Sequence, residues 1–199
     1  MIIKADKNKV LKEFREKYVA DRYKEELKNI LEKYNENKDS IKEKLTSKFN
    51  SICQEAVFLQ KEGLKGEIKY IYFSMLRTSI LENKGEWRID LYDEKWFVDK
   101  EECSINIELD FIYEPLFKHM KELSNKKKEY LRTIKEKDIE DIKLAEANKY
   151  HSLALNIIRG MLQELLECAS YKEMEKKEDI VIMAGEYMDT AIQINSKKS

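Results

Sequence analysis

The sequence is poor in residues that interrupt regular structure, since it contains one proline and five glycines among 199 residues. Because these two residue types end or kink helices, their scarcity predicts long uninterrupted elements. The sequence also has no run of 18 apolar residues, and its first ten residues show neither an apolar core nor a small-residue cleavage site. We therefore predict neither a transmembrane helix nor a secretion signal, and we expect a cytoplasmic protein with no membrane partner.

Residues that commonly build metal or catalytic sites are equally scarce. The three cysteines, Cys53, Cys103 and Cys168, are far apart and form no CxxC pair. This argues against a disulfide framework or a zinc site and favours reduced, mostly buried thiols. The two histidines, His119 and His151, belong to no Glu-x-x-His pair of the kind that binds metals in helical bundles.

A loop that holds a phosphate-bearing cofactor needs glycines leading into a helix N-terminus. The best candidate, Gly63-Leu-Lys-Gly66, lacks the Lys-Ser/Thr ending of a P-loop and the third glycine of a dinucleotide fingerprint. A turn that ends a helix explains it better. We therefore predict no catalytic residue, no metal ligand and no cofactor.

Charge is abundant but balanced, with 38 basic and 39 acidic residues and a net charge of −1. Such a chain has no overall field to attract nucleic acid, so a nucleic-acid partner is disfavoured. The distribution is uneven, because residues 1–66 carry +4, residues 67–113 carry −5 and residues 114–199 carry 0. Complementary packing of the first two parts explains this, and the alternative is an acidic, aromatic face directed at a partner.

Apolar residues recur at spacings of three and four over five segments, which predicts amphipathic helices. These segments are Asp6–Asn35, Ser40–Lys61, Leu116–Ile134, Ile139–Cys168 and Ile180–Ile194. Asp6 is the predicted N-cap of the first helix. Ser40 and Glu43 match the Ser-x-x-Glu capping box and predict the start of the second helix.

The middle of the chain has a different composition. Residues Ile68–Leu81 are rich in Tyr, Ile, Phe and Thr, Asn83-Lys-Gly85 is a turn signal, and Glu86–Tyr92 alternates apolar and polar residues. Trp96–Val98 and Ser104–Leu109 could add further strands. We predict an antiparallel hairpin or meander, although Ile68–Leu81 could instead be a buried helix, because short apolar runs do not separate the two states.

Together these patterns predict a mostly α-helical α+β fold with a small antiparallel sheet packed against long helices. No linker rich in Pro, Gly or Ser divides the chain, so one domain over residues 1–199 is expected. In this prediction N-terminal helices occupy residues 1–66, the β-rich segment occupies 67–113, and C-terminal helices occupy 114–199.

The most distinctive stretch is Asp90-Leu-Tyr-Asp-Glu-Lys-Trp-Phe-Val-Asp99, in which acids are interleaved with aromatic residues. Tyr92, Trp96 and Phe97 could form a recognition surface, because Tyr and Trp offer a large contact area at low entropic cost. The alternative is that Trp96 and Phe97 belong to the core beside a strand turn and that the acids are merely solvated.

Four segments carry a resemblance to a known family: Tyr70–Ile80, Arg88–Asp99, Asp110–Tyr113 and Gly185–Asp189. They resemble an uncharacterised family from Gram-positive bacteria whose members are often named pentapeptide repeat-containing proteins. The chain has no such repeats, so it is similar to the non-repeat part, most clearly over residues 68–117. The family has no established activity and supplies no catalytic residues. The resemblance implies that five residues matter to the fold or to its surface: Arg77, Tyr92, Asp93, Trp96 and Asp99.

The function predicted from these observations is that of a non-enzymatic protein-interaction module. Long amphipathic helices suit self-association, including a homodimer, or docking into a partner's groove. The competing prediction is a small-ligand-binding protein or an enzyme with a pocket between sheet and helices. Its candidate residues would be Arg77, Tyr92, Asp93, Trp96 and one of the two histidines.

Overall fold

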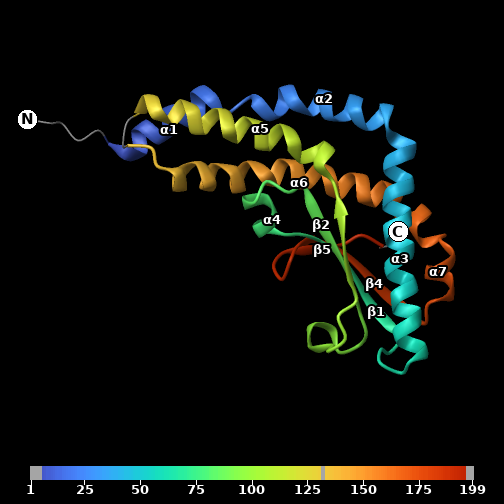
Figure 1. Cartoon of the computed structure of the whole chain (residues 1–199). Coiled ribbons are helices and arrows are strands. Elements are labelled where there is room, and N and C mark those ends of the chain that lie inside the picture. The colour runs from blue at the N-terminus through green and yellow to red at the C-terminus, as the bar shows by residue number, and fades with distance from the viewer. Residues whose placement is uncertain (1–5, 131–132, 196–199) are drawn as a thin grey trace, which may run out of the picture.

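The structure is a computed structural model that describes residues 6–130 and 133–195 (Figure 1). Its long helices are α1 (Lys7–Tyr18), α2 (Arg22–Glu36), α3 (Lys38–Lys61), α5 (Asp110–Lys126) and α6 (Glu136–Leu166). Its short helices are α4 (Arg77–Leu81), α7 (Ala169–Glu173) and the 3₁₀ helices η1 (Trp96–Val98) and η2 (Lys127–Tyr130). Within the described residues, no helix is both long enough and apolar enough to cross a membrane.

The N-terminal helices differ from the predicted boundaries. The predicted helix Asp6–Asn35 is divided at residues 19–21 into α1 and α2. The N-cap Asp6 is confirmed, because its carboxylate accepts a hydrogen bond from the backbone N–H of Asn8. Helix α3 begins at Lys38, so Ser40 lies inside it and the predicted capping box is wrong.

The strands form one five-stranded sheet with the order β3-β2-β1-β4-β5. They are β1 (Ile68–Met75), β2 (Glu86–Tyr92), β3 (Ser104–Glu108), β4 (Lys176–Glu186) and β5 (Ala191–Gln193). Strands β1, β2 and β3 form the predicted antiparallel meander. Strand β4, however, pairs parallel to β1, so the sheet is mixed and the prediction of a purely antiparallel sheet is wrong.

The predicted helix Ile180–Ile194 is wrong, because the segment contains the second half of β4 and all of β5. The central residues of β4, 181–184, are a short apolar run, and the spacing within such a run does not distinguish a strand from a buried helix. The run is apolar because it forms an inner strand of the sheet, between β1 and β5. The prediction that residues 114–199 are helical throughout is therefore wrong for the last part of the described chain, which forms β4 and β5. The predicted strand Trp96–Val98 is likewise wrong, because it forms η1.

One face of the sheet forms the hydrophobic core with helices α3, α5 and α6. Alternate residues of β1 and β2, such as Phe73 and Trp87, point to this face and are buried. Phe73 stacks on Phe49 of α3 at a centroid distance of 6.0 Å. The indole N–H of Trp87 donates a hydrogen bond to the Tyr113 hydroxyl of α5 at 2.8 Å, and His151 of α6 stacks on the same indole at 4.8 Å. The predicted packing of a small sheet against long helices is thereby confirmed.

The opposite face of the sheet, which we call the open face, carries no long helix among the described residues (Figure 1). The long helices lie on one side of the sheet, and α1, α2, α5 and α6 run together as an arm that extends beyond it (Figure 1). The loop between β2 and β3, which contains η1, folds over part of the open face. Side chains that point outward from the open face are therefore not covered by a long helix.

The turn from β4 to β5 depends on a glycine. A Cβ atom on Gly185 would lie 2.2 Å from the carbonyl oxygen of Thr190 and 2.4 Å from the Cα atom of Ala191. We expect Gly185→Ala to lower the free energy of unfolding by about 1–3 kcal/mol, because the backbone of the hairpin must move. Urea denaturation followed by circular dichroism would measure this.

Gly160 provides the matched control for this prediction. It lies within α6, is exposed, and has no atom within 4 Å of an added Cβ. Gly160→Ala should raise the free energy of unfolding by about 0.5–1 kcal/mol, because alanine restricts the unfolded chain and favours the helix. Equal effects at the two positions would contradict the close approach at Gly185.

Candidate functional site

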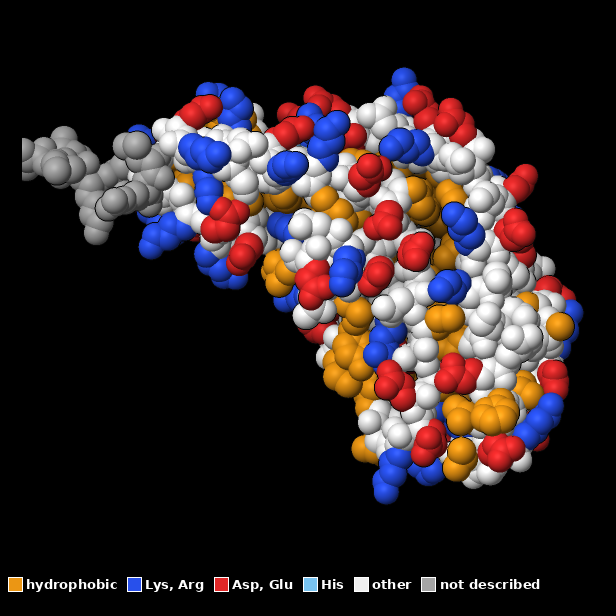
Figure 2. Space-filling model, in the orientation of Figure 1, with side chains coloured by type: hydrophobic (Ala, Val, Ile, Leu, Met, Phe, Trp, Pro, Cys, Tyr) orange, Lys and Arg blue, Asp and Glu red, His pale blue; other side chains and the backbone are white. Residues whose placement is uncertain are grey.

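Five aromatic side chains gather on the open face and form what we call the aromatic cluster. They come from β1, β2 and η1, and they are Tyr70, Tyr72, Tyr92, Trp96 and Phe97. Neighbouring ring centroids are 4.8–6.3 Å apart, a range in which aromatic rings attract one another. Figure 2 shows hydrophobic side chains reaching the surface around the sheet, whereas charged side chains dominate the surface of the helical arm.

Strand alternation places the three tyrosines of the cluster opposite the core. Ile71 and Phe73 are buried on the core side of β1, so Tyr70 and Tyr72 point to the open face. Tyr70 is paired across the strands with Tyr92 of β2, and such cross-strand aromatic pairs stabilise a sheet. The tyrosines thus form a platform that the sheet itself holds in place.

Trp96 and Phe97 of η1 lie over this platform but do not become fully buried. Trp96 stacks on Tyr70 at 5.5 Å and Phe97 packs against Tyr92 at 5.3 Å, yet 42% and 39% of their surfaces remain exposed. Trp96 also has a φ angle of +55°, in the left-handed region that bulky residues rarely adopt. The surrounding loop must therefore maintain this conformation, and strain of this kind is concentrated at functional sites.

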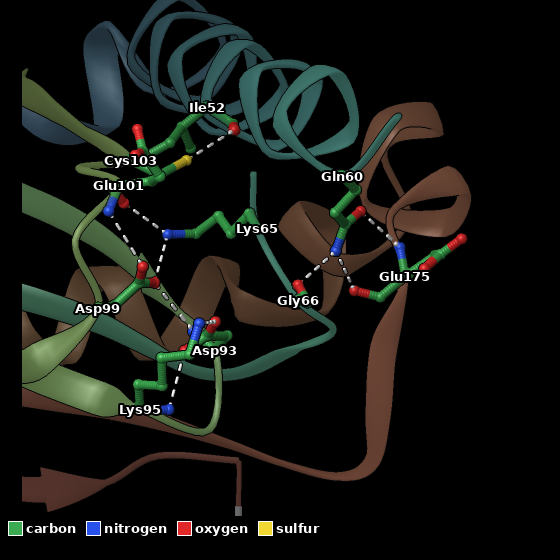
Figure 3. A network of polar contacts seen from close by, with 10 residues as sticks. All are labelled: Ile52, Gln60, Lys65, Gly66, Asp93, Lys95, Asp99, Glu101, Cys103 and Glu175. Carbon is green, nitrogen blue, oxygen red and sulfur yellow. Dashed lines mark hydrogen bonds and ion pairs between the residues drawn. The ribbon is translucent and has the colours of Figure 1, made fainter. Parts of the chain in front are cut away.

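A buried ion pair anchors the loop that carries η1 (Figure 3). The ammonium group of Lys65, which precedes β1, lies 2.6 Å from Oδ2 of Asp99, and the two side chains are only 0% and 2% exposed. Lys65 also donates to the carbonyl oxygen of Glu101 at 2.8 Å. The other carboxylate oxygen of Asp99 accepts from the backbone N–H of Glu101 at 3.2 Å. Because the charged groups of Lys65 and Asp99 are shielded from water, their contact holds the loop far more strongly than a surface pair would.

The segment that bears Lys65 is itself held in place by α3. The amide nitrogen of Gln60 donates to the carbonyl oxygens of Gly66 at 3.0 Å and Glu175 at 2.7 Å, and its amide oxygen accepts from the N–H of Glu175 at 3.1 Å (Figure 3). One side chain at the end of α3 thereby joins the entries to β1 and β4. Lys65 is positioned between this fixed point and the loop.

Asp93 closes the other end of the same loop. Its carboxylate accepts a hydrogen bond from the backbone N–H of Lys95 at 2.8 Å, and its carbonyl oxygen accepts from the N–H of Trp96 at 3.1 Å. Its own N–H donates to Oδ2 of Asp99 at 3.3 Å. A Cβ atom on Gly66 would lie 3.3 Å from the Asp93 carboxylate, so glycine suits the approach of these two segments. Both aspartates are therefore part of the support of the cluster.

A second polar group lies next to the aromatic cluster on the open face. Arg88 donates to Oδ1 of Asp90 at 2.7 Å and to Glu102 at 2.9 Å, and its guanidinium lies over the Tyr187 ring at 5.3 Å. Asp90 is 1% exposed, and its Oδ2 atom has no hydrogen-bond partner among the described residues. Burial raises the pKa of Asp90, and its hydrogen bond from Arg88 offsets this only in part.

The structure separates the five residues singled out in the sequence into three places. Tyr92 and Trp96 belong to the aromatic cluster, and Asp93 and Asp99 lie in the loop that supports it. Arg77 lies apart, beyond the opposite end of β1, where its guanidinium pairs with Glu186 of β4.

The sequence reasoning missed three contributors to this site. The sequence predicts a strand that contains Tyr70 and Tyr72 but does not say to which face of the sheet they point. Their alternation with the apolar residues Ile71 and Phe73, which are buried, is the signal that places them on the open face. Lys65 had no distinguishing signal, because its partner Asp99 follows it only after two strands and their loops.

The two histidines lie in different surroundings. His119 contacts the carbonyl oxygen of Tyr18 at 2.8 Å, whereas His151 stacks on Trp87 in the core. Cys53 and Cys103 are buried, as predicted, and Cys168 is partly buried; all three thiols are free. No group of three or more His, Cys, Asp or Glu side chains within 6–130 and 133–195 could hold a metal ion.

The space between the sheet and its helices is filled by core side chains such as Phe73 and Trp87. A cleft of about 720 Å³ lies elsewhere, between α2, α3 and the start of α5, with Lys33, Lys44 and Phe111 in its walls. The alternative of a ligand-binding pocket between sheet and helices stays a prediction.

Comparison of the chain with family models, with curated proteins and with solved structures finds no match. The resemblance to the pentapeptide repeat-containing family therefore stays a prediction, and the site is interpreted from its own geometry.

The Lys65–Asp99 pair predicts a large and specific loss of stability. Lys65→Met would leave a buried carboxylate without its counter-charge, so we expect the free energy of unfolding to fall by about 3–5 kcal/mol. The double variant Lys65→Met/Asp99→Leu should recover much of this loss, because it removes both charges. Lys61→Met, which breaks the exposed pair with Glu173, is the control and should change stability by at most about 1 kcal/mol. A small effect at Lys65 in urea denaturation would contradict the anchoring role.

The two histidines, of which His119 is buried and His151 is partly buried, predict a pH-dependent stability. Burial lowers the pKa of His151, and burial also lowers that of His119, from the ordinary value of about 6.5. Their neutral forms stabilise the fold above pH 6.5, and this stability is lost as the pH falls through the lowered folded-state pKa values. We expect His151→Phe, which keeps a ring on Trp87, to lose less stability than the wild type between about pH 7.5 and about pH 5.5. Denaturation curves at both pH values would test this, and equal losses would refute it.

Proposed function

We propose that this chain is a non-enzymatic protein-interaction module and that the aromatic cluster is its binding surface. The observation that carries the proposal is that Trp96 and Phe97 stay partly exposed while the buried Lys65–Asp99 pair holds their loop. Aromatic side chains are common anchors of protein interfaces, because each buries a large area and loses little conformational freedom.

The rigidity of the support favours binding. The carboxylates of Asp93 and Asp99 accept hydrogen bonds from backbone N–H groups of the loop and hold it, and the tyrosine platform lies beneath it. A partner would therefore not have to bear the entropic cost of ordering this loop, which is a main cost of association. The strained φ of Trp96 fits the same proposal. The loop holds this residue, with its indole at the surface, in a backbone conformation that a bulky residue alone would rarely adopt.

The local charge supports a protein partner rather than a nucleic acid. Residues 86–102 contain seven acidic and three basic residues, a net charge of −4, and phosphate groups would be repelled by it. Exposed aromatic rings could otherwise stack on bases, but single-strand binders combine such rings with a basic groove. The partner is accordingly another protein, or a second copy of this chain in a homodimer.

Peptide display provides a direct test. We expect a random peptide library to yield binders of the wild type whose affinity falls by about tenfold or more for Trp96→Ala and for Phe97→Ala, as for other interface anchors. Phe58→Ala is the control, because Phe58 is also exposed but lies on α3. The proposal would be refuted if the affinity of the selected peptides did not change for Trp96→Ala and Phe97→Ala, or if it fell equally for Phe58→Ala.

A further inference from the structure

The acidic character of the open face is not cancelled by its own basic residues. Residues 86–102 contain seven acids and three bases, and two bases from outside the segment pair with its acids, Lys65 with Asp99 and Lys177 with Glu94. With these two bases counted, the acids still outnumber the bases by two. Glu94 and Glu102 keep 70% and 71% of their side-chain surface exposed despite their own contacts. A docking partner would therefore meet negative charge around an aromatic centre.

The exposed parts of the Trp96 and Phe97 rings are suited to a cation. Lysine and arginine side chains are attracted to the face of an aromatic ring, and tryptophan gives the strongest such contact. The chain uses this contact itself, since Arg88 lies over the ring of Tyr187 at 5.3 Å. Trp96 and Phe97 present further ring surface without a charged group of the described chain over them.

Asp90 adds an acceptor that the described residues leave unused. It lies on the open face, because Ile89 and Leu91 on either side of it point into the core. Its register partner is Tyr72 of the cluster, and Tyr92 is two residues away on the same strand. Oδ1 is bonded to Arg88, whereas Oδ2 is buried without a donor, which is costly unless a binding partner supplies one.

We propose that the aromatic cluster binds a segment of another protein that carries lysine or arginine, with its cationic side chain against Trp96 and Phe97 and directed to Asp90. This inference rests on the proposed function, since it names the chemistry of the partner for the same surface. Charge complementarity selects this occupant: the carboxylates attract the cation, and the rings contact both the cation and its aliphatic stem.

A matched pair of display libraries tests this inference. The two libraries have equal length and diversity, but in one of them every lysine and arginine codon is replaced by a glutamine codon. On the wild type we expect about tenfold greater enrichment from the library with basic residues. Asp90→Asn and the exposed double variant Glu94→Gln/Glu102→Gln should each remove most of this excess. Glu173→Gln, an exposed acid on α7, should leave it unchanged.

Two further measurements keep the outcomes distinct. Thermal unfolding of each variant shows whether it still folds. If Asp90→Asn does not fold, the double variant Glu94→Gln/Glu102→Gln tests the inference instead, because its two side chains are exposed and their replacement should not disturb the fold. In a Trp87→Phe background, the fluorescence of Trp96 reports directly whether a selected peptide covers the indole. Equal enrichment from both libraries, with binding that still requires Trp96, would overturn this inference and leave the proposed function standing. Selected peptides that never change the Trp96 fluorescence would overturn both.

Discussion

The ion pair between Lys65 and Asp99 is the contact on which the exposed part of the structure depends. It joins Lys65, three residues before β1, to Asp99 in the loop between β2 and β3, and water does not reach either charge. Two charges buried in this way rarely stabilise a fold more than apolar residues would, but they define one geometry, because each misplacement leaves a charge unpaired. Here the geometry that they define keeps Trp96 in a strained conformation above the sheet.

Much of the fold follows from local patterns in the sequence. Helical structure in four of the five predicted segments, the Asp6 cap and the meander of β1, β2 and β3 depend on residues close together in the chain, and these are present. The fifth predicted helix, Ile180–Ile194, is wrong. The aromatic residues within 90–99 could be predicted as a distinctive surface because they too are close together in the chain. Local patterns do not predict which strands pair. Strand β4 contains only a short apolar run, and its parallel pairing with β1 depends on tertiary contacts.

The support of the candidate site was hidden for a related reason. Asp93 and Asp99 were expected either in a recognition surface or as merely solvated acids, but both side chains are buried and accept hydrogen bonds from backbone groups of their own loop. Asp99 can be buried because Lys65 lies beside it in space, and no spacing in the sequence encodes this contact. The exposed Trp96 and Phe97 contradict the alternative that they are core residues, because the loop turns them outward.

The parallel pairing of β1 with β4 also determines when the sheet can be completed. Ile71 of β1 lies beside Ile182 of β4, so the middle of the sheet closes a loop that contains most of the molecule, including α5 and α6. Contacts this distant along the chain are costly in entropy and form late in folding. During synthesis, one edge of β1 therefore stays unpaired until β4 has been made, and in that period it can pair with a neighbouring chain.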